Sequence, residues 1–452
     1  MLYPLFIIKS MEKELTVRKV IAKDTIFFFP SHLRTIEYKG KILVVSPETA
    51  NWLVLENTEQ YKFFQLLESM DLGNALERFQ GEYCNALYTV TQIVAKDFEN
   101  KKVKLKNNGG SMQLYLTNEC NMRCPHCYMF AGVKKERELT TEEIFNIIKS
   151  FKEFNGNTIV FSGGEIALRK DLYDILRYSY DLGIANEILT NGTLWTEEMI
   201  KAIAPLITRV QISIDGYDET TNSKIRGKGN FDKALKTISY FYESRVDTEV
   251  SVTPYLDERL EEDYPYYIEF AQSLNQRFHR ANFLVKFTFD VLNGRAIHVS
   301  DRQKADYQEI ITKIYNELYG DFVDKPFLDF HKHGGIEENC DYGNIAISSD
   351  GNVCLCPIIP EMQPIGNIRN CNFDKLLEIA QKARELSDIN NLVPCKDCEL
   401  KYICGGECRV KNFTGFKEND LAKIAVSKRV CSQERKNNFY DMMLRLNQDL
   451  YR

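Results

Sequence analysis

From Met112 onward, short segments in which apolar and polar residues alternate are followed by longer segments with apolar residues every three or four positions. The first pattern is typical of half-buried strands and the second of amphipathic helices. Strands are predicted at "MQLYLT", "TIVFS", "NEILT", "RVQISI", "TEVSVT" and "VKFTFD", and helices beginning near Thr140, Leu172, Thr196, Asn230, Asp263 and Asp301. Strands that alternate with helices imply a parallel sheet. The fold class is therefore α/β, and we expect an open, partial (β/α)6 barrel.

The residues before this region have a different pattern. Two alternating runs in "HLRTIEYKGKILVVSP" surround Lys39 and Gly40 and predict a hairpin. Helical spacing follows in "TEQYKFFQLLESM", "LGNALERF" and "ALYTVTQIVAKDF". A hairpin with three short helices indicates a winged-helix-like module. The polar stretch "ENKKVKLKNNGGS" then predicts a linker.

From about His331 the periodicity fades, and cysteine, glycine and turn residues dominate. Such a segment is typical of a domain stapled by metal rather than by a large core. The expected domains are 1–108, 109–320 and 321–452.

Composition narrows the class of protein. Apolar residues make up 44% of the 452 residues, which is ample for folded cores, and the net charge of −6 gives no electrostatic reason to expect nucleic acid or an anionic membrane as partner. No apolar run approaches the roughly 20 residues that span a bilayer. The start, "MLYPLFIIKSMEKE", lacks the basic region and cleavage site of a signal peptide. A soluble, cytoplasmic protein is expected.

The chain has 13 cysteines, and they are unevenly spread. In a reducing cytosol such cysteines are more often metal ligands than disulfides. Cys84 stands alone, and we expect it to be a buried structural residue. Cys120, Cys124 and Cys127 form one cluster, and the remaining nine lie from Cys340 onward. Metal chemistry is therefore expected in at least two places.

The first cluster, "CNMRCPHCY", has the spacing C-x3-C-x2-C and follows the first predicted barrel strand, at the end where barrel enzymes keep their sites. Zinc would require a fourth ligand, and His126 is adjacent to Cys127 on a tight loop. A 4Fe–4S cubane takes one ligand per iron, so three cysteines leave one iron open to a chelating molecule.

This motif resembles that of the radical S-adenosylmethionine (SAM) superfamily. The resemblance implies that SAM chelates the open iron and is cleaved to a 5′-deoxyadenosyl radical. "FSGGE", "LTNG", "QISIDG" and "KIRGKGNF" match the family's later SAM-binding stretches. The resemblance implies that the SAM amino group binds at Gly163, Gly164 and Glu165, and that Asn191 also contacts SAM. It further implies that the SAM ribose contacts Ser213 and Asp215, that the SAM carboxylate pairs with Arg226, and that the adenine packs on His126.

The later cysteines include "CKDCELKYICGGEC" and resemble the SPASM extension of radical SAM enzymes, which holds two auxiliary 4Fe–4S clusters. The resemblance assigns Cys340, Cys356 and Cys408 to the first cluster, and Cys395, Cys398, Cys404 and Cys431 to the second. Cys354 is the nearest spare ligand for the first cluster and Cys371 a weaker one; an iron left open to substrate is the third possibility. A zinc ribbon is the competing interpretation of residues 395–408.

SPASM enzymes mostly modify peptides, and the N-terminal module resembles the peptide-recognition element of maturases of ribosomally made peptides. This resemblance predicts a maturase that cross-links a precursor peptide through a thioether or carbon–carbon bond. The implied partners are a peptide with a leader sequence and an electron donor such as flavodoxin or ferredoxin. No catalytic base is identified; Asp341 and Glu361 are weak candidates.

Three alternatives stay open: a peptide epimerase, a protein-oxidising maturase and a zinc-binding winged-helix regulator. Maturases of sulfatases usually carry aspartate after the second SPASM cysteine, where this chain has Pro357.

Overall fold

The computed structural model describes residues 8–12, 15–19, 21–99, 104–105, 110–289, 291, 294–319, 335–336, 340, 342–358, 362–413, 416 and 431–449. Asp341 and Glu361 lie outside the described residues. Within the described ranges, no helix combines the length and apolar character needed to cross a membrane.

A nine-stranded sheet forms the centre of the molecule, in the order β12-β11-β10-β9-β8-β7-β14-β15-β16. Its first six strands run parallel and follow chain order, which confirms the predicted series of strand–helix units. They are β7 (Ser111–Tyr115), β8 (Thr158–Ser162), β9 (Ala185–Thr190), β10 (Arg209–Ile214), β11 (Asp247–Val252) and β12 (Phe283–Phe287). Because neighbouring parallel strands end at one edge, residues distant in sequence meet there.

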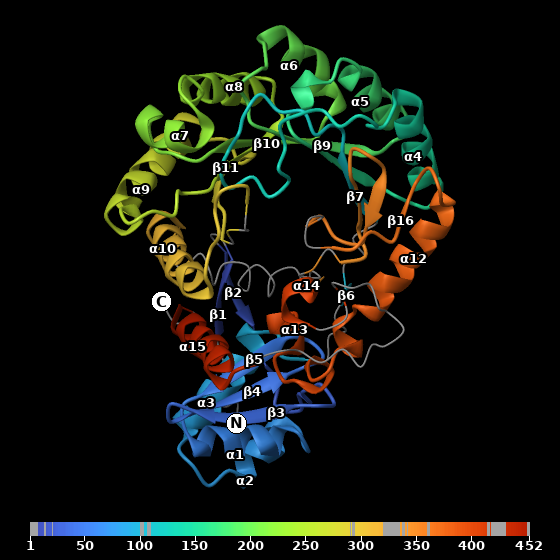
Figure 1. The fold of residues 1–452 in the computed structure, drawn as a ribbon. Helices are drawn as coiled ribbons and strands as arrows, with labels where there is room; N and C mark the ends of the chain where they lie inside the picture. The colour runs from blue at the N-terminus through green and yellow to red at the C-terminus, as the bar shows by residue number, and fades with distance from the viewer. Residues whose placement is uncertain are drawn as a thin grey trace.

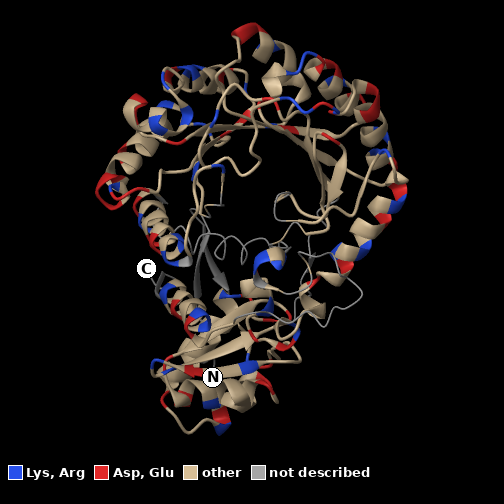
Figure 2. Cartoon of the chain, in the orientation of Figure 1, with Lys and Arg blue, Asp and Glu red and all other residues tan. Residues whose placement is uncertain are grey.

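Helices cover the outer side of this curved sheet (Figure 1). They are α4 (Thr141–Glu153), α5 (Leu172–Asp181), α6 (Glu197–Ile203), α7 (Glu219–Arg226), α8 (Phe231–Glu243), α9 (Leu260–Arg277) and α10 (Asp301–Tyr319), with 3-10 turns η1 (Ile166–Leu168) and η2 (Ala204–Leu206). Thr140 and Glu143 form a capping box at the start of α4. Apolar residues such as Ile144 and Ile175 pack into the core between helices and sheet. Lys and Arg alternate with Asp and Glu along these helices (Figure 2).

Some boundaries differ from the sequence prediction. The sixth strand begins at Phe283 rather than Val285, and α9 begins at Leu260 rather than Asp263. Helix α7 was not predicted, since "ETTNSKIR" has few apolar residues. The Asp218 side chain caps it by accepting from the backbone of Thr221.

The C-terminal residues extend the central sheet. β14 (Ile345–Ile347) pairs in parallel with β7, and β15 (Asn352–Cys354) and β16 (Gly366–Asn367) follow in antiparallel pairs. The expected domain boundary near residue 320 therefore does not interrupt the sheet. The remaining elements are α12 (Phe373–Leu386), η4 (Ile389–Asn391), η5 (Cys395–Asp397), α13 (Lys401–Cys404), α14 (Arg409–Asn412) and α15 (Gln433–Asp449), together with the pair β6 (Lys104–Leu105) and β13 (Gly335–Ile336).

The N-terminal part contains a three-stranded antiparallel sheet and three helices, drawn in blue at the bottom of Figure 1. The predicted hairpin is β3 (Arg34–Tyr38) and β4 (Lys41–Ser46); β5 (Asn51–Leu55) was not predicted. The three helices appear as expected: α1 (Thr58–Leu67), α2 (Leu72–Arg78) and α3 (Tyr83–Ala95). A separate hairpin pairs β1 (Ile8–Glu12) with β2 (Leu15–Lys19). We call residues 21–99 the N-terminal module.

Candidate functional site

The three clustered cysteines lie on the loop that leaves β7, at the carboxyl edge of the parallel sheet. Cys120, Cys124 and Cys127 all line one cavity of about 290 Å³. The backbone N–H of Cys127 donates to the carbonyl of Cys124 at 3.2 Å, which keeps the loop tight. Burial raises the pKa of Cys120, and it raises the pKa of Cys124 to about 11. Thiolates are the metal-binding form, so a cofactor here would displace protons when it binds.

The ends of the next strands complete the cavity wall. Of the residues that the sequence suggested for SAM, the following line the cavity: His126, Gly163, Gly164, Asn191, Ser213 and Arg226. Glu165 and Asp215 are fully buried instead, with 0% exposure each, and stand behind the wall.

The cavity wall also includes polar residues that the sequence analysis missed, among them Thr190, Gln211, Ser251, Thr253 and Thr288. Gln211 with Ser213, and Ser251 with Thr253, are spaced by two along their strands. Since every second residue of a strand faces the same side, that spacing was the signal that could have identified them.

Gly163 and Gly164 are required by the backbone at the end of β8. Gly163 has φ +146°, and a Cβ there would lie 2.4 Å from the carbonyl oxygen of Thr117. A Cβ on Gly164 would lie 2.0 Å from the carbonyl oxygen of Glu119. The two glycines therefore allow the end of β8 to approach the start of the cysteine loop.

Glu165 ties neighbouring strand ends together. One carboxylate oxygen accepts the Thr190 hydroxyl at 2.7 Å and the Ala167 N–H at 3.1 Å, and the other accepts the Asn191 N–H at 2.8 Å. The Asn191 amide in turn donates to Asn121 at 2.9 Å, within the cysteine loop. Burial raises the pKa of Glu165, although these three donors oppose the shift. In this structure the side chain positions Asn191 rather than lining the cavity.

Asp215 plays the same part for two cavity residues. Its Oδ2 lies 2.6 Å from Arg226 Nε and 3.5 Å from His126 Nε2, and its Oδ1 accepts the Thr253 N–H at 3.2 Å. Burial would lower the pKa of Arg226, but Asp215 raises it overall; burial lowers the pKa of His126. Arg226 thus stays a cation, and His126 tends to be neutral.

The four cysteines expected at the second auxiliary cluster meet in space. Cys395, Cys398, Cys404 and Cys431 line a single small cavity together with Arg435 and Lys436. Burial raises the pKa of Cys398 to about 11. Two cations beside four thiols suit a group that gains negative charge when its ligands ionise.

The residues expected at the first auxiliary cluster lie on segments that contact one another. Burial raises the pKa of Cys340, and the nearby Arg409, which follows Cys408, opposes this shift. A 2.8 Å bond from the Gly343 N–H to the Leu355 carbonyl joins the segments that carry Cys340 and Cys356. Cys354 is fully buried at the end of β15. Cys371 is exposed. Of these two candidates for the fourth ligand, only Cys354 is shielded from solvent.

A pair of tyrosines connects this region with the SAM-type loop. Tyr115 donates to the carbonyl of Pro357 at 2.8 Å, and its hydroxyl lies 3.2 Å from that of Tyr128, which follows Cys127. Burial raises the pKa of both phenols. The two cysteine regions are thus in hydrogen-bonded contact.

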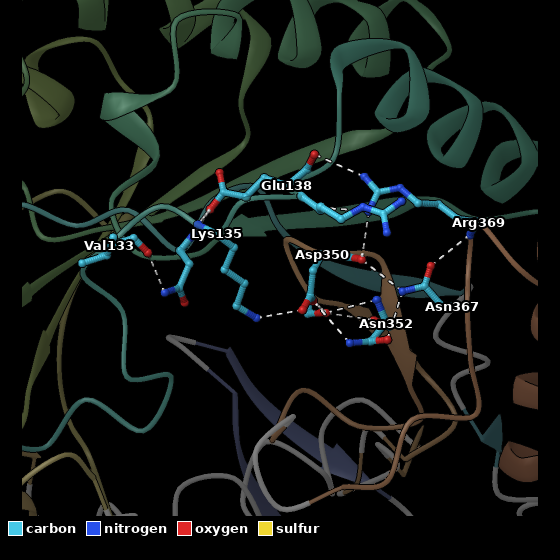
Figure 3. Close-up of polar contacts among 10 residues, drawn as sticks. Val133, Lys135, Glu138, Asp350, Asn352, Asn367 and Arg369 are labelled. Carbon is cyan, nitrogen blue, oxygen red and sulfur yellow. Dashed lines mark hydrogen bonds and ion pairs between the residues drawn. The ribbon is translucent and has the colours of Figure 1, made fainter.

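Polar and charged side chains connect the residues around β15 and β16 to the segment that precedes α4 (Figure 3). Lys135 Nζ lies 3.0 Å from Asp350 Oδ2, and Asn367 donates to the Asp350 carbonyl at 3.0 Å. Arg369 binds both carboxylate oxygens of Glu143, at 2.6 and 2.9 Å, and this holds the pKa of Glu143 near 2. These contacts join the start of α4 to the turns around β15 and β16.

The prediction for Cys84 was wrong. Cys84 is exposed, and its thiol lies 3.4 Å from Glu82. It occupies the first turn of α3, where the apolar face of the helix points elsewhere. None of the 13 cysteines, all of which lie among the described residues, forms a disulfide.

The donor set fits iron–sulfur clusters. Three thiols surround the larger cavity and four surround the smaller one. A cubane divides its protein ligands among four irons.

Comparisons with known proteins agree with this geometry. Residues 114–271 match the Radical SAM superfamily. The chain is 28% identical to an AdoMet-dependent heme synthase of Methanosarcina barkeri, over 66% of this chain and 90% of the relative. It is 27% identical to the mycofactocin maturase MftC of Mycolicibacterium smegmatis, over 67% and 78% respectively.

A solved structure of anSMEcpe with bound AdoMet has the same fold, with a TM-score of 0.55 and 20% identity over 75% of this chain and 95% of that one. The family match assigns residues 114–271 to a radical SAM domain, and the protein is an enzyme.

Proposed function

We propose that this enzyme is a maturase that cross-links a ribosomally made precursor peptide through a thioether or carbon–carbon bond. The observation that carries the proposal is the open edge of β3: in the described part of the chain, β3 pairs with β4 alone. An exposed sheet edge can bind an extended peptide as an added strand. The similarity to a maturase supports this assignment.

The proposed SAM site uses Cys120, Cys124 and Cys127 to hold a 4Fe–4S cluster. A cluster held there would bind SAM at its open iron and would supply, on reduction, the 5′-deoxyadenosyl radical that the proposed hydrogen abstraction from the peptide needs. The Arg226 guanidinium is suited to the SAM carboxylate, because it lines the cavity and keeps its charge. Ser213 and His126 also line the cavity, where Ser213 would contact the ribose and a neutral His126 would contact the adenine.

Glu165 and Asp215 act on SAM indirectly in this proposal. Both carboxylates are buried and already bonded to the protein. Glu165 fixes Asn191, and Asp215 orients Arg226 and His126. This differs from the direct contacts that the family resemblance implied.

Two auxiliary clusters complete the proposed cofactor set. Cys395, Cys398, Cys404 and Cys431 hold one; the other takes Cys340, Cys356 and Cys408, with Cys354 as fourth ligand. An auxiliary cluster would accept the electron that is released when the cross-link forms. A flavodoxin or ferredoxin would donate the electron that reduces the cluster at the SAM site. The domain assignment 1–108, 109–320 and 321–452 accompanies this proposal, with β14–β16 as the sheet extension supplied by the last unit.

Leader capture at β3 has a direct test in two proline variants. Successive N–H groups of an antiparallel strand alternate between its two sides, so one of Thr35 and Ile36 donates toward β4 and the other toward the open edge. Thr35→Pro and Ile36→Pro remove one donor each. We expect the edge-facing variant to fold normally but to process peptide poorly. Equal processing by that variant and the unchanged protein would contradict capture at this edge.

The function itself is tested with the peptide encoded beside the gene, incubated with reduced, reconstituted enzyme and SAM in deuterated water. Fragmentation mass spectrometry should locate the loss of a hydrogen pair between two side chains. Uptake of one backbone deuterium without any loss would instead mean epimerisation.

A tetrapyrrole-modifying enzyme is the second candidate, because a relative matched over 90% of its length is a heme synthase. Formation of heme from an iron porphyrin, with no change in the peptide, would favour it.

A further inference from the structure

The sheet of the N-terminal module is buried on both faces. One face packs on α1–α3. The other belongs to a separate apolar cluster shared with α13 and α15, from the opposite end of the chain. The buried residues of this cluster come from both parts of the chain. The sheet contributes Leu43, Val45, Trp52 and Val54, and the C-terminal part contributes Leu400, Ile403, Tyr440, Met442, Met443 and Leu446.

Polar contacts fix the orientation of this joint. Asp441 accepts the Tyr38 hydroxyl at 3.1 Å and lies 2.5 Å from Lys39 Nζ. The rings of Tyr38 and Tyr440 are 5.3 Å apart. The Asn447 amide donates to the Tyr88 hydroxyl at 3.0 Å. These contacts are distributed along most of α15, so they fix both the position and the orientation of the helix against the N-terminal module.

The same elements carry the second cysteine set. Cys404 ends α13, and Cys431 stands two residues before α15 begins. Cys398 and Cys404 themselves pack against the shared apolar cluster. Glu399, next to Cys398, accepts the Lys436 ammonium at 2.9 Å and the Tyr440 hydroxyl at 2.5 Å. The cysteines are thus positioned by side chains that rest on the N-terminal sheet.

We infer that the N-terminal module forms part of the scaffold of the second auxiliary site, in addition to any role in capturing peptide. By seating α13 and α15 side by side, the sheet holds Cys398, Cys404 and Cys431 around one cavity. This inference rests on the proposed ligation by Cys395, Cys398, Cys404 and Cys431. Tyr38, which ends the open strand β3, touches both Tyr440 and Asp441, so the proposed peptide edge borders this scaffold.

The test compares iron and acid-labile sulfide per chain in full-length variants. Met443→Glu places a charge in the buried joint, whereas Asn438→Glu adds the same charge at an exposed position of α15. Met443→Glu should lose about four irons, one cubane, and Asn438→Glu none. Equal iron in the two variants would overturn the inference.

A milder variant tests the inference in case Met443→Glu misfolds as a whole. Asp441→Asn weakens the polar contacts without burying a charge, and it should release iron to a chelator several-fold faster than Asn438→Glu. If Met443→Glu lost all of its iron, the rate of iron release from Asp441→Asn would decide. Release from Asp441→Asn at the same rate as from Asn438→Glu would then overturn the inference. The double variant Cys395→Ala/Cys398→Ala separates the two claims: undiminished iron in it would refute the proposed ligands rather than the role of the module.

Discussion

Arg226 Nε lies 2.6 Å from Asp215 Oδ2, and the two side chains are 10% and 0% exposed. Among the described residues, neither atom has a hydrogen-bond partner of good geometry, so the contact is an ion pair. The guanidinium also borders the cavity. Asp215 therefore compensates a buried cation whose donors are available to an anionic ligand.

Replacing Asp215 should harm both stability and SAM binding. Asp215→Asn leaves the Arg226 charge buried without a counterion, and breaking such pairs costs about 3–5 kcal/mol. We expect a clear drop in melting temperature and weaker SAM affinity by calorimetry. Asp215→Asn combined with Arg226→Met should recover part of the stability but none of the affinity. Equal stability losses in the single and double variants would argue against the ion pair.

Glu165→Gln tests whether this side chain works by positioning. The carboxylate accepts three donors, and glutamine must turn its own N–H₂ group toward at least one of them. One unsatisfied buried donor costs about 1–3 kcal/mol. We expect a lower melting temperature and weaker SAM binding with the cysteine loop still able to take up iron. Loss of SAM affinity with unchanged stability would point to direct contact instead.

Lys96 predicts a pH dependence in the N-terminal module. Within the part of the chain that the structure describes, its ammonium has no hydrogen-bond partner, and it lies 5.2 Å from the centre of the Trp52 ring. Burial lowers its pKa from 10.5 to about 7. The unfolded chain then binds the extra proton between these values, so stability should rise with pH from about 7 to 10.5, by at most about 1.4 kcal/mol per pH unit.

Lys96→Met should remove this slope and stabilise the module at pH 7, whereas Lys62→Met at an exposed position should change neither. Urea unfolding followed by tryptophan fluorescence, in a Trp195→Phe background that leaves Trp52 as reporter, measures both effects. A slope that persists in Lys96→Met would assign it to other groups.

The barrel could be predicted because its signals are local. Strands of five or six residues alternate clearly, and helix starts such as Thr140 carry their own capping chemistry. The β14–β16 extension could not, since two- and three-residue strands are too short to show a period. Its pairing with β7 depends on tertiary contacts alone.

The site was predictable in part for the same reason. Cysteine spacing and strand-end glycines are visible in sequence, but whether a carboxylate faces a ligand or a neighbour is not. Glu165 and Asp215 both stand at strand ends, yet their oxygens are taken by Asn191 and Arg226. Cys84 shows the converse, because an isolated cysteine in a helical pattern gives no indication of its face.

The most direct test of the central claim measures 5′-deoxyadenosine formed from SAM by the anaerobically reconstituted, reduced enzyme. The unchanged protein should form it, and Cys120→Ala, Cys124→Ala and Cys127→Ala should each abolish it, while Cys84→Ala should not. Formation that survives in all three variants would contradict a SAM-cleaving cluster at this loop.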